Sequence, residues 1–188
     1  NIPFIMTFNT PPGGLFRVRL SRHYCSSIIA SSGSIAEQLK SSYKSLADRI
    51  EQVNIGTFVT DDASCFSNPG QVTSLVAVAD FNSVFDFEPL LRAVRHLAID
   101  GYEFIMALIG SGSGERKLRR QIRSLGLSHI VPVVPHMRPL RSIFSGADIY
   151  IQPQDIYGIN RFLLEAMSVG LAVASSNRSE EEALADLV

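Results

Sequence analysis

The chain has 188 residues, 46% of them hydrophobic and 19% charged, and its formal net charge is -1. This composition is typical of a globular protein with one domain or somewhat more. With this net charge, no basic field indicates a nucleic acid or an anionic membrane as a partner. No apolar run approaches the ~18 residues that a membrane span requires. The two cysteines, Cys25 and Cys65, lack the spacing of a metal site, which favours reduced thiols.

The first 56 residues alternate strand-like and helix-like patterns. An apolar run at 2–8 predicts a short buried strand, and spaced apolar residues at 15–26 predict a helix. Residues 27–32 predict a second strand. Ser34 and Glu37 stand three residues apart as in a capping box, which predicts the start of a second helix.

The helix predicted at 15–26 has a cationic face that contains Arg17, Arg19, Arg22 and His23. Two interpretations of this face remain open. It is either solvated surface, as charged helix faces commonly are, or a binding site for an anionic substrate.

Residues 57–73 follow no regular pattern and include Ser67-Asn-Pro-Gly70. This segment is the best candidate for a linker between two domains. It also holds Asp61 and Asp62. Adjacent acids in a loop without a third ligand favour a solvated turn over a metal site.

From residue 74 onward, apolar runs alternate regularly with helix-like segments. Strands are predicted at 75–79, 104–109, 130–134, 147–152 and 171–174. Helices are predicted at 86–100, 115–125 and 140–145, after the turn at 157–161, and after Ser179. The alternation predicts an α/β fold, with an open parallel sheet covered by helices on both faces. The chain begins in a strand-like segment and ends in a helical one, so we expect it to belong to a longer protein.

The segment from Pro153 to Gly170 is where a ligand is expected. It follows a predicted strand, turns at Gly158 and continues into a helix that carries one acid, Glu165. Ligands of such folds lie beyond the carboxyl ends of the strands. A carboxylate at this place can accept hydrogen bonds from a vicinal diol such as a ribose. The alternative is a surface glutamate stabilised by the helix dipole, and both remain open.

Two glycines after the second strand of this half offer a further candidate site. Gly110 and Gly112 precede a predicted helix, where backbone N–H groups can approach a phosphate. A dinucleotide fingerprint would need a third glycine at 115, which is Glu115, so NAD binding is not favoured. His136 follows the third strand and is expected at the same sheet edge.

The segment from Pro153 to Ser175 resembles the signature of the group 1, family 4-like glycosyltransferases of GT-B fold. That signature reads roughly P-S-x-x-E-G-x-x-R-x-L-L-E-A-M-A-x-G-x-P-V-V-A-S. Ile109-Gly-Ser-Gly112 is similar to the family's V-G-x-G, and residues 147–153 to its A-D-x-x-x-x-P strand. Upstream, residues 2–9 and 27–32 resemble the end of the family's N-terminal domain.

The resemblance implies a GT-B fold with Rossmann-like sheets and a retaining transfer from a nucleotide-sugar donor, with no metal or other cofactor. Residues 1–56 would be the end of the acceptor domain, 57–73 the linker, and 74–188 a truncated donor domain. The acceptor would be a glycan or a lipid-linked molecule. The expected location is the cytoplasm, with membrane association at its inner face through the absent N-terminal part.

The resemblance also assigns roles to residues of the expected site. Glu165 would hold the ribose hydroxyls, and the backbone N–H groups of 158–162 would bind the diphosphate, with a charge-assisted contact from Arg161. Residues 135–138 would flank the base. The expected donor site comprises Gly110, Gly112, His136, Arg138, Tyr157, Gly158, Asn160, Arg161, Phe162 and Glu165.

This chain departs from the family where charge matters most. Tyr157 stands in place of the family's first signature glutamate, and no catalytic residue can be assigned. Asp80 and Phe85 stand where the family has the arginine and lysine that neutralise the leaving diphosphate, which carries about two negative charges. The alternative to a divergent transferase is therefore a catalytically silent homologue that binds a nucleotide or a partner subunit.

Overall fold

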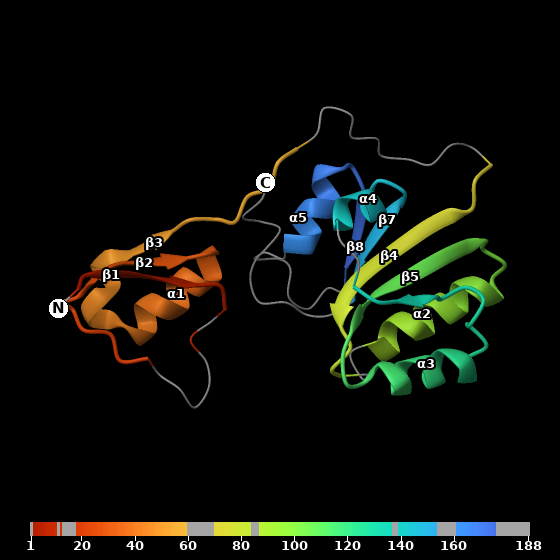
Figure 1. Cartoon of the computed structure of the whole chain (residues 1–188), viewed down its shortest axis with the longest axis horizontal. Coiled ribbons are helices and arrows are strands. Elements are labelled where there is room, and N and C mark those ends of the chain that lie inside the picture. Colours follow the sequence, from red (N-terminus) through yellow and green to blue (C-terminus); the bar gives the residue numbers. More distant parts are fainter. Residues whose placement is uncertain are drawn as a thin grey trace. The chain divides into compact units, whose positions relative to one another are not determined.

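A computed structural model describes residues 2–10, 12, 18–59, 70–83, 87–136, 139–153 and 161–175. The chain forms two compact units, and in sequence the first division falls between Gly56 and Thr57 (Figure 1). Each unit has its own parallel sheet and its own hydrophobic core. Most of the predicted linker lies outside the described residues, so the domain boundaries stay a prediction.

The first unit is a small parallel sheet with a helix packed on one face. Its elements are β1 (Phe4–Phe8), β2 (Cys25–Ala30), α1 (Gly33–Ser42), a 3₁₀ helix η1 (Lys44–Arg49) and β3 (Ile50–Gln52). The strands are all parallel, with β2 between β1 and β3. The core of this unit consists of Cys25, Ile28, Ala30, Ile35, Ala36, Leu39 and Leu46.

The first strand forms as predicted, but it is not buried. β1 lies at the edge of its sheet, and Ile5 is 62% exposed. An apolar run indicates a strand, but it does not reveal whether both faces of that strand are covered.

The helix predicted at 15–26 is wrong in its described part. Residues 18–24 contain no helix, and Cys25 begins β2. Tertiary contacts hold this segment instead: Tyr24 accepts a hydrogen bond from the Phe4 backbone N–H at 2.8 Å. Arg22 donates to Asp48, with Nη2 and Oδ2 2.8 Å apart. Within the described residues, therefore, Arg22 lies in an ion pair and not on a cationic helix face.

Helix α1 begins as predicted but is capped by a different serine. Ser32 has an extended backbone, and its Oγ accepts a hydrogen bond from the Ile35 N–H at 3.4 Å. Ser34 lies inside the helix. Glu37 accepts a hydrogen bond from Lys40 at 2.9 Å. The predicted capping box is therefore wrong, and the cap lies two residues earlier.

The second unit contains one parallel sheet with the strand order β6-β5-β4-β7-β8. Its strands are β4 (Thr73–Asp80), β5 (Phe104–Ser111), β6 (Val133–Val134), β7 (Ile149–Gln152) and β8 (Ala172–Ser175). Its helices are α2 (Glu88–Ile99), α3 (Glu115–Ser124), α4 (Leu140–Phe144) and α5 (Arg161–Ser168). This arrangement confirms the α/β fold predicted from the sequence.

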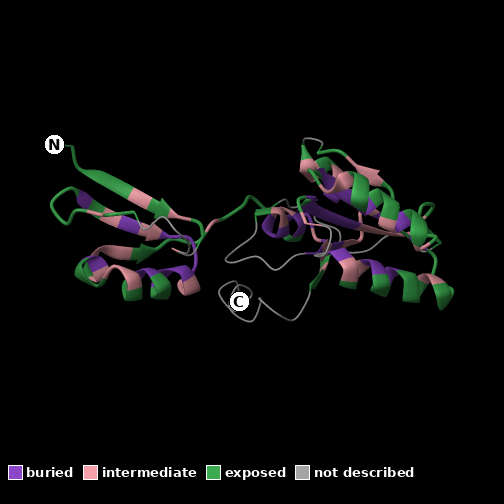
Figure 2. Cartoon of the chain, turned by 90° about the horizontal axis from the view of Figure 1, so that it is seen from below, coloured by how far each residue is buried: buried purple, intermediate pink, exposed green. Residues whose placement is uncertain are grey.

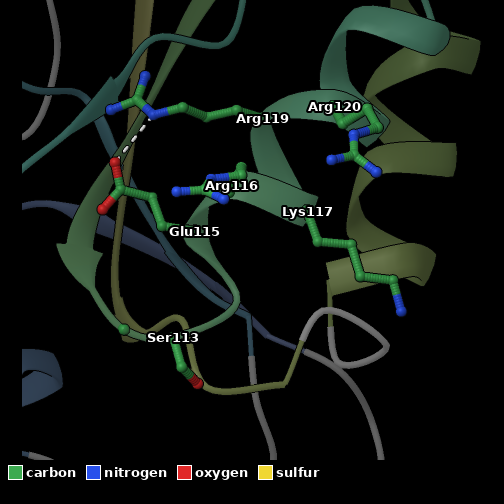
Figure 3. Close-up of a pocket in the computed structure, with 7 residues that line it drawn as sticks. Ser113, Glu115, Arg116, Lys117, Arg119 and Arg120 are labelled. Atoms are coloured by element: carbon green, nitrogen blue, oxygen red, sulfur yellow. Dashed lines mark hydrogen bonds and ion pairs between the residues drawn. The ribbon is translucent and has the colours of Figure 1, made fainter.

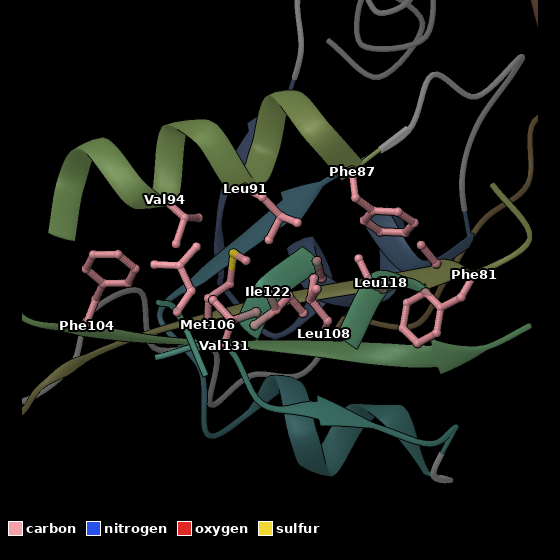
Figure 4. Packing of buried hydrophobic residues seen from close by; sticks show 13 residues of the cluster. Phe81, Phe87, Leu91, Val94, Phe104, Met106, Leu108, Leu118, Ile122 and Val131 are labelled. Atoms are coloured by element: carbon pink, nitrogen blue, oxygen red, sulfur yellow. The ribbon is translucent and has the colours of Figure 1, made fainter. Parts of the chain in front are cut away.

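Helices cover both faces of this sheet. One face packs against α2 and α3 through a cluster that includes Phe81, Leu91 and Leu118 (Figure 4). The other face packs against α4 and α5 around Phe144 and Tyr150. Figure 2 shows the buried positions of the helices on the sides that meet the sheet. The central strand β4 is buried over Val76–Ala79 on both faces, as its continuous apolar run requires.

Three glycines end helices of this unit. Gly101, Gly126 and Gly170 follow α2, α3 and α5 with φ of 86°, 74° and 88°. These positive values are readily adopted by glycine, which has no Cβ to clash. The first residue of the helix predicted at 86–100, Asp86, lies outside the described residues.

The third strand of this unit is shorter than predicted. Only Val133 and Val134 form β6, although the chain before them also accepts hydrogen bonds from β5. Met106 donates to the Ile130 carbonyl and Leu108 to the Pro132 carbonyl, both at 2.9 Å. Pro132 has no N–H to donate, which limits the regular ladder to the residues after it.

The strand order places a topological switch point at the carboxyl end of β4. The chain proceeds from β4 to β5 and β6 on one side, and then returns to β7 on the other side. In open α/β sheets the crevice at such a point receives the ligand. At the opposite, amino edge, Asp148 ties β7 to β4 by accepting hydrogen bonds from Ser74 N at 2.7 Å and Ser74 Oγ at 3.0 Å.

Candidate functional site

The carboxyl edge of the second sheet brings an acid and a histidine together. Asp80 ends β4, and His136 follows β6, two strands away. The distance from His136 Nε2 to Asp80 Oδ1 is 4.0 Å, and the side chains are 37% and 78% exposed. This separation exceeds a hydrogen bond, so the attraction is electrostatic and requires a protonated imidazole.

The charge of Asp80 bears directly on any anionic ligand at this edge. Its carboxylate lies at the switch point and is largely exposed. A carboxylate repels a phosphate group at short range, although water screens the effect. A protonated His136 would offset this charge. The structure thus brings His136 to the edge where the sequence predicts it, while its contact with a ligand stays a prediction.

The glycine turn after β5 is packed tightly against the end of β4. A Cβ added to Gly110 would lie 2.0 Å from the Ala79 carbonyl oxygen, and one added to Gly112 would lie 2.5 Å from the Phe81 carbonyl carbon. Both distances are impossible for real atoms. The two glycines are therefore required by the approach of the protein backbone, whatever ligand binds there.

Backbone hydrogen bonds fix this turn to the segment after β4. The Phe81 N–H donates to the Ser111 carbonyl at 3.0 Å, and the Gly114 N–H donates to the Phe81 carbonyl at 2.7 Å. The Gly114 N–H at the start of α3 is thus already used within the protein. A Gly-x-Gly pattern in sequence does not distinguish close packing of this kind from a phosphate cradle.

Helix α5 presents its two charged residues on one side. Leu163, Leu164 and Ala166 are buried, whereas Glu165 is half-buried and Arg161 is exposed. Arg161 and Glu165 are four residues apart and so are neighbours on the helix surface. Phe162 is half-buried and packs against the core between the sheet and α4 and α5.

Several residues of the expected site lie outside the described residues. They are Arg138, Tyr157, Gly158 and Asn160, together with Phe85. Their assignment to the donor site stays a prediction. Of the predicted site residues that are described, Gly110 is the penultimate residue of β5, and Gly112 and His136 follow strands at the carboxyl edge. Arg161, Phe162 and Glu165 belong to α5.

A shallow surface hollow of about 770 Å³ lies beside the glycine turn, over the start of α3 (Figure 3). Four of the residues that line it are basic. Arg119 Nε donates to Glu115 Oε1 at 2.8 Å and Arg119 Nη2 to the Val133 carbonyl at 3.0 Å. The hollow is lined by Gly112, Ser113, Glu115, Arg116, Lys117, Arg119 and Arg120. This basic helix is not among the sites predicted from the sequence, although the five cations of α3 are visible there.

Across the residues that the structure describes, no group of three or more His, Cys, Asp or Glu side chains is placed to hold a metal ion. In the same part of the chain, no helix has the length and apolar character needed to cross a bilayer.

The chain is similar in sequence to known glycosyltransferases. Residues 67–184 match the family model of the group 1 glycosyl transferases. The putative colanic acid biosynthesis glycosyltransferase WcaL of Salmonella typhimurium is 28% identical over 120 residues, covering 59% of this chain and 29% of that protein. An uncharacterized glycosyltransferase of Haemophilus influenzae is 24% identical over 106 residues, covering 56% of this chain and 30% of that protein.

Solved structures share the fold over most of the chain. The complex of Anabaena Alr3699/HepE with UDP and glucose has a TM-score of 0.76 at 16% identity and covers 99% of this chain. The lipopolysaccharide outer core galactosyltransferase WaaB has a TM-score of 0.66 at 21% identity and covers 84% of this chain. The chain spans 55% and 45% of these two proteins, and under a third of the curated relatives.

Proposed function

Because the chain belongs to the group 1 glycosyl transferases, we propose that the whole protein transfers a sugar from a nucleotide-sugar donor with retention of configuration. The acceptor is a glycan or a lipid-linked molecule. The observation that carries this proposal is Glu165, half-buried on α5 within the segment that the family model matches.

The donor lies in this proposal at the carboxyl edge of the second sheet. Glu165 accepts hydrogen bonds from the ribose hydroxyls, because a carboxylate offers two acceptor oxygens to a vicinal diol. Arg161 shares its helix face and gives the diphosphate a cationic partner. Gly110 and Gly112 border the cleft as backbone without side chains, and residues 135–138 flank the base.

This chain must stabilise the leaving diphosphate with residues other than the arginine and lysine that its family uses. Asp80 stands at the place of the family's arginine, and its exposed carboxylate opposes a phosphate. We propose that Arg161 and Arg138 supply the positive charge instead. No metal or other cofactor takes part.

The domain organisation and the location of the protein belong to the same proposal. Residues 1–56 end the acceptor domain, 57–73 link the two domains, and 74–188 form most of the donor domain. The protein works in the cytoplasm at the inner face of the membrane, and a preceding N-terminal part supplies the acceptor site. The chain alone is not expected to turn over substrate.

The first test is thermal unfolding of the chain with UDP, GDP and ADP. UDP is the leading candidate, because Alr3699/HepE and the pneumococcal O-GlcNAc transferase GtfA were both solved with it. A nucleotide at a hundred times its Kd adds about 2.7 kcal/mol to the free energy of unfolding. Glu165→Ala should remove most of this gain. The matched control is Glu103→Ala, an exposed glutamate just before β5 at the amino edge, which should retain it.

Two outcomes would contradict the proposal in different ways. If none of the three nucleotides stabilises the chain, donor binding fails, and the catalytically silent homologue becomes the better description. If the nucleotide stabilises Glu165→Ala and wild type equally, donor binding stands but the role of Glu165 is wrong. Retention itself is tested on the whole protein by the anomeric configuration of the product, which must match that of the donor.

A further inference from the structure

Positive charge is concentrated on the two helices that cover one face of the second sheet. Helices α2 and α3 carry seven of the chain's 17 lysine and arginine residues but only two of its 18 acidic residues. Both acids are already paired, Glu88 with Arg92 and Glu115 with Arg119. The remainder of the chain is therefore acidic, although the chain as a whole is almost neutral.

Most of this charge on α3 points away from the core. Leu118 and Ile122 are buried against the sheet, and Arg116, Arg120 and Arg123 lie on the opposite side of the helix at spacings of three and four residues. All three arginines are exposed. Among the described residues, no acidic side chain pairs with any of them. Figure 3 shows Arg119 turned to Glu115, while Lys117 and Arg120 extend outward from the helix.

The outer side of α2 continues this surface. Both helices pack on the same core, and they lie side by side on one face of the sheet (Figure 1). Arg92, Arg95 and Ile99 follow one another at helical spacing along the outer side of α2, and all are exposed. At the end of this helix, Ile99 is 69% exposed and Tyr102 is 64% exposed.

We propose that this basic face docks on an anionic lipid bilayer. The basic face is defined as Arg95, Arg116, Lys117, Arg120 and Arg123, which leaves out Arg92 and Arg119 because each is paired with a glutamate. A lysine or arginine near an anionic membrane surface contributes about a factor of five to binding. Several such cations together hold the protein reversibly on the membrane surface. At about 0.1 M salt, their attraction to the negative lipids extends over roughly 10 Å.

A bilayer fits the basic face better than a nucleic acid or an acidic protein. Exposed Ile99 and Tyr102 at the end of the cationic surface have side chains suited to the boundary between headgroups and acyl chains. A nucleic-acid backbone is charged and provides no apolar surface for an isoleucine to contact. Because the apolar side of α3 is committed to the core, the helix does not insert. It lies at headgroup level, and the contact is mainly electrostatic.

Vesicle co-sedimentation of the whole 188-residue chain tests this proposal. One set of vesicles is pure phosphatidylcholine, and the other contains about 30 mol% phosphatidylglycerol to provide the negative surface potential. We expect binding to the anionic vesicles only. Raising the salt from about 0.1 M to about 0.5 M should release the chain, because screening shortens the range of the attraction.

A pair of triple variants separates the basic face from net charge. Arg116→Gln, Arg120→Gln and Arg123→Gln together should lower the partition coefficient about a hundredfold, at about a factor of five per cation. The control is Arg19→Gln, Lys40→Gln and Lys44→Gln, which removes three exposed cations of the first unit and should change binding much less. Thermal unfolding checks that both variants remain folded.

Three results would overturn the proposal. Equal binding to neutral and anionic vesicles would exclude an electrostatic contact. Equal losses of vesicle binding in the two triple variants would show that the basic face contributes no more than other exposed cations. Binding to duplex DNA in place of the anionic vesicles, with the same loss in the α3 variant, would assign the face to a nucleic acid.

Discussion

At Gly110 the protein itself leaves no room for a side chain. The Ala79 carbonyl oxygen and the Phe81 ring both lie within 3.0 Å of where a Cβ would stand. The carbonyl belongs to the central strand, which cannot move without disturbing the sheet on both faces. The backbone at Gly110, beside the candidate site, is therefore held in place by the same packing that stabilises the core.

A substitution of Gly110 measures how much this close packing contributes to the free energy of unfolding. Gly110→Ala should lower the free energy of unfolding by about 1–3 kcal/mol, the usual cost of overpacking. The control is Gly56→Ala, since no atom lies within 4 Å of the added methyl group there, and its effect should be close to zero. Both are measured by urea unfolding. Equal stability of the two variants would show that there is room for a Cβ at Gly110, near the end of β5.

At the scale of the element, the start of α1 shows what local sequence patterns leave undecided. Two serines precede or begin this helix, and the capping-box spacing favours Ser34. The structure instead uses Ser32, because its backbone is extended where the chain leaves β2. The extended conformation depends on the sheet and is not visible in a four-residue pattern.

The two serines give a direct comparison. Ser32→Ala should destabilise the chain by about 1 kcal/mol, the usual cost of losing an N-cap. Ser34→Ala, inside the helix, should cost clearly less, because alanine is the better helix former there. Denaturant unfolding of both variants decides between them. A larger loss of stability for Ser34→Ala than for Ser32→Ala would show that Ser34 is the capping residue.

Elements with strong periodicity and clear ends were predictable from the sequence. The central strand at 73–80 has a continuous apolar run, and α2 and α3 have apolar stripes followed by Gly101 and Gly126. The segment at 18–24 was not predictable, because its apolar spacing fits a helix while its contacts are made with β1 and with Asp48.

The candidate site was predictable to a similar degree. The carboxyl edge and the helix that carries Glu165 follow from the strand–turn–helix pattern. The meeting of Asp80 with His136 did not follow, since it depends on the order β6-β5-β4 in the sheet. The packing role of Gly110 was likewise hidden, because a glycine in sequence does not say which backbone approaches it.

At the scale of the whole molecule, each unit has a core of its own. The cluster around Ile28 and Leu39 belongs to the first unit, and the two clusters on either face of β4 belong to the second. Separate cores are the usual property of parts that fold independently. The second unit should therefore not depend on the first for its stability.

Truncation tests this independence. Residues 57–188 contain the whole second unit together with two short segments grouped with the first unit, Ile156–Arg161 and Asn177–Val188. Alone they should unfold cooperatively, with a free energy of unfolding within about 1 kcal/mol of that of the second unit in the whole chain. Residues 104–188 serve as the control, because they lack β4 and α2 and with them much of one core. They should show no cooperative transition by circular dichroism. Failure of 57–188 to fold would mean that the two units form a single cooperative structure.

The exposed pair at the sheet edge makes the chemistry of this protein open to redesign. Asp80 and His136 lie at the carboxyl edge of the sheet, with side chains that are 78% and 37% exposed. Because Asp80 is so exposed, a substitution there would leave no cavity in the core. A reversal of sign at the end of β4 would thus change the electrostatic potential at this edge while the hydrophobic core stays the same.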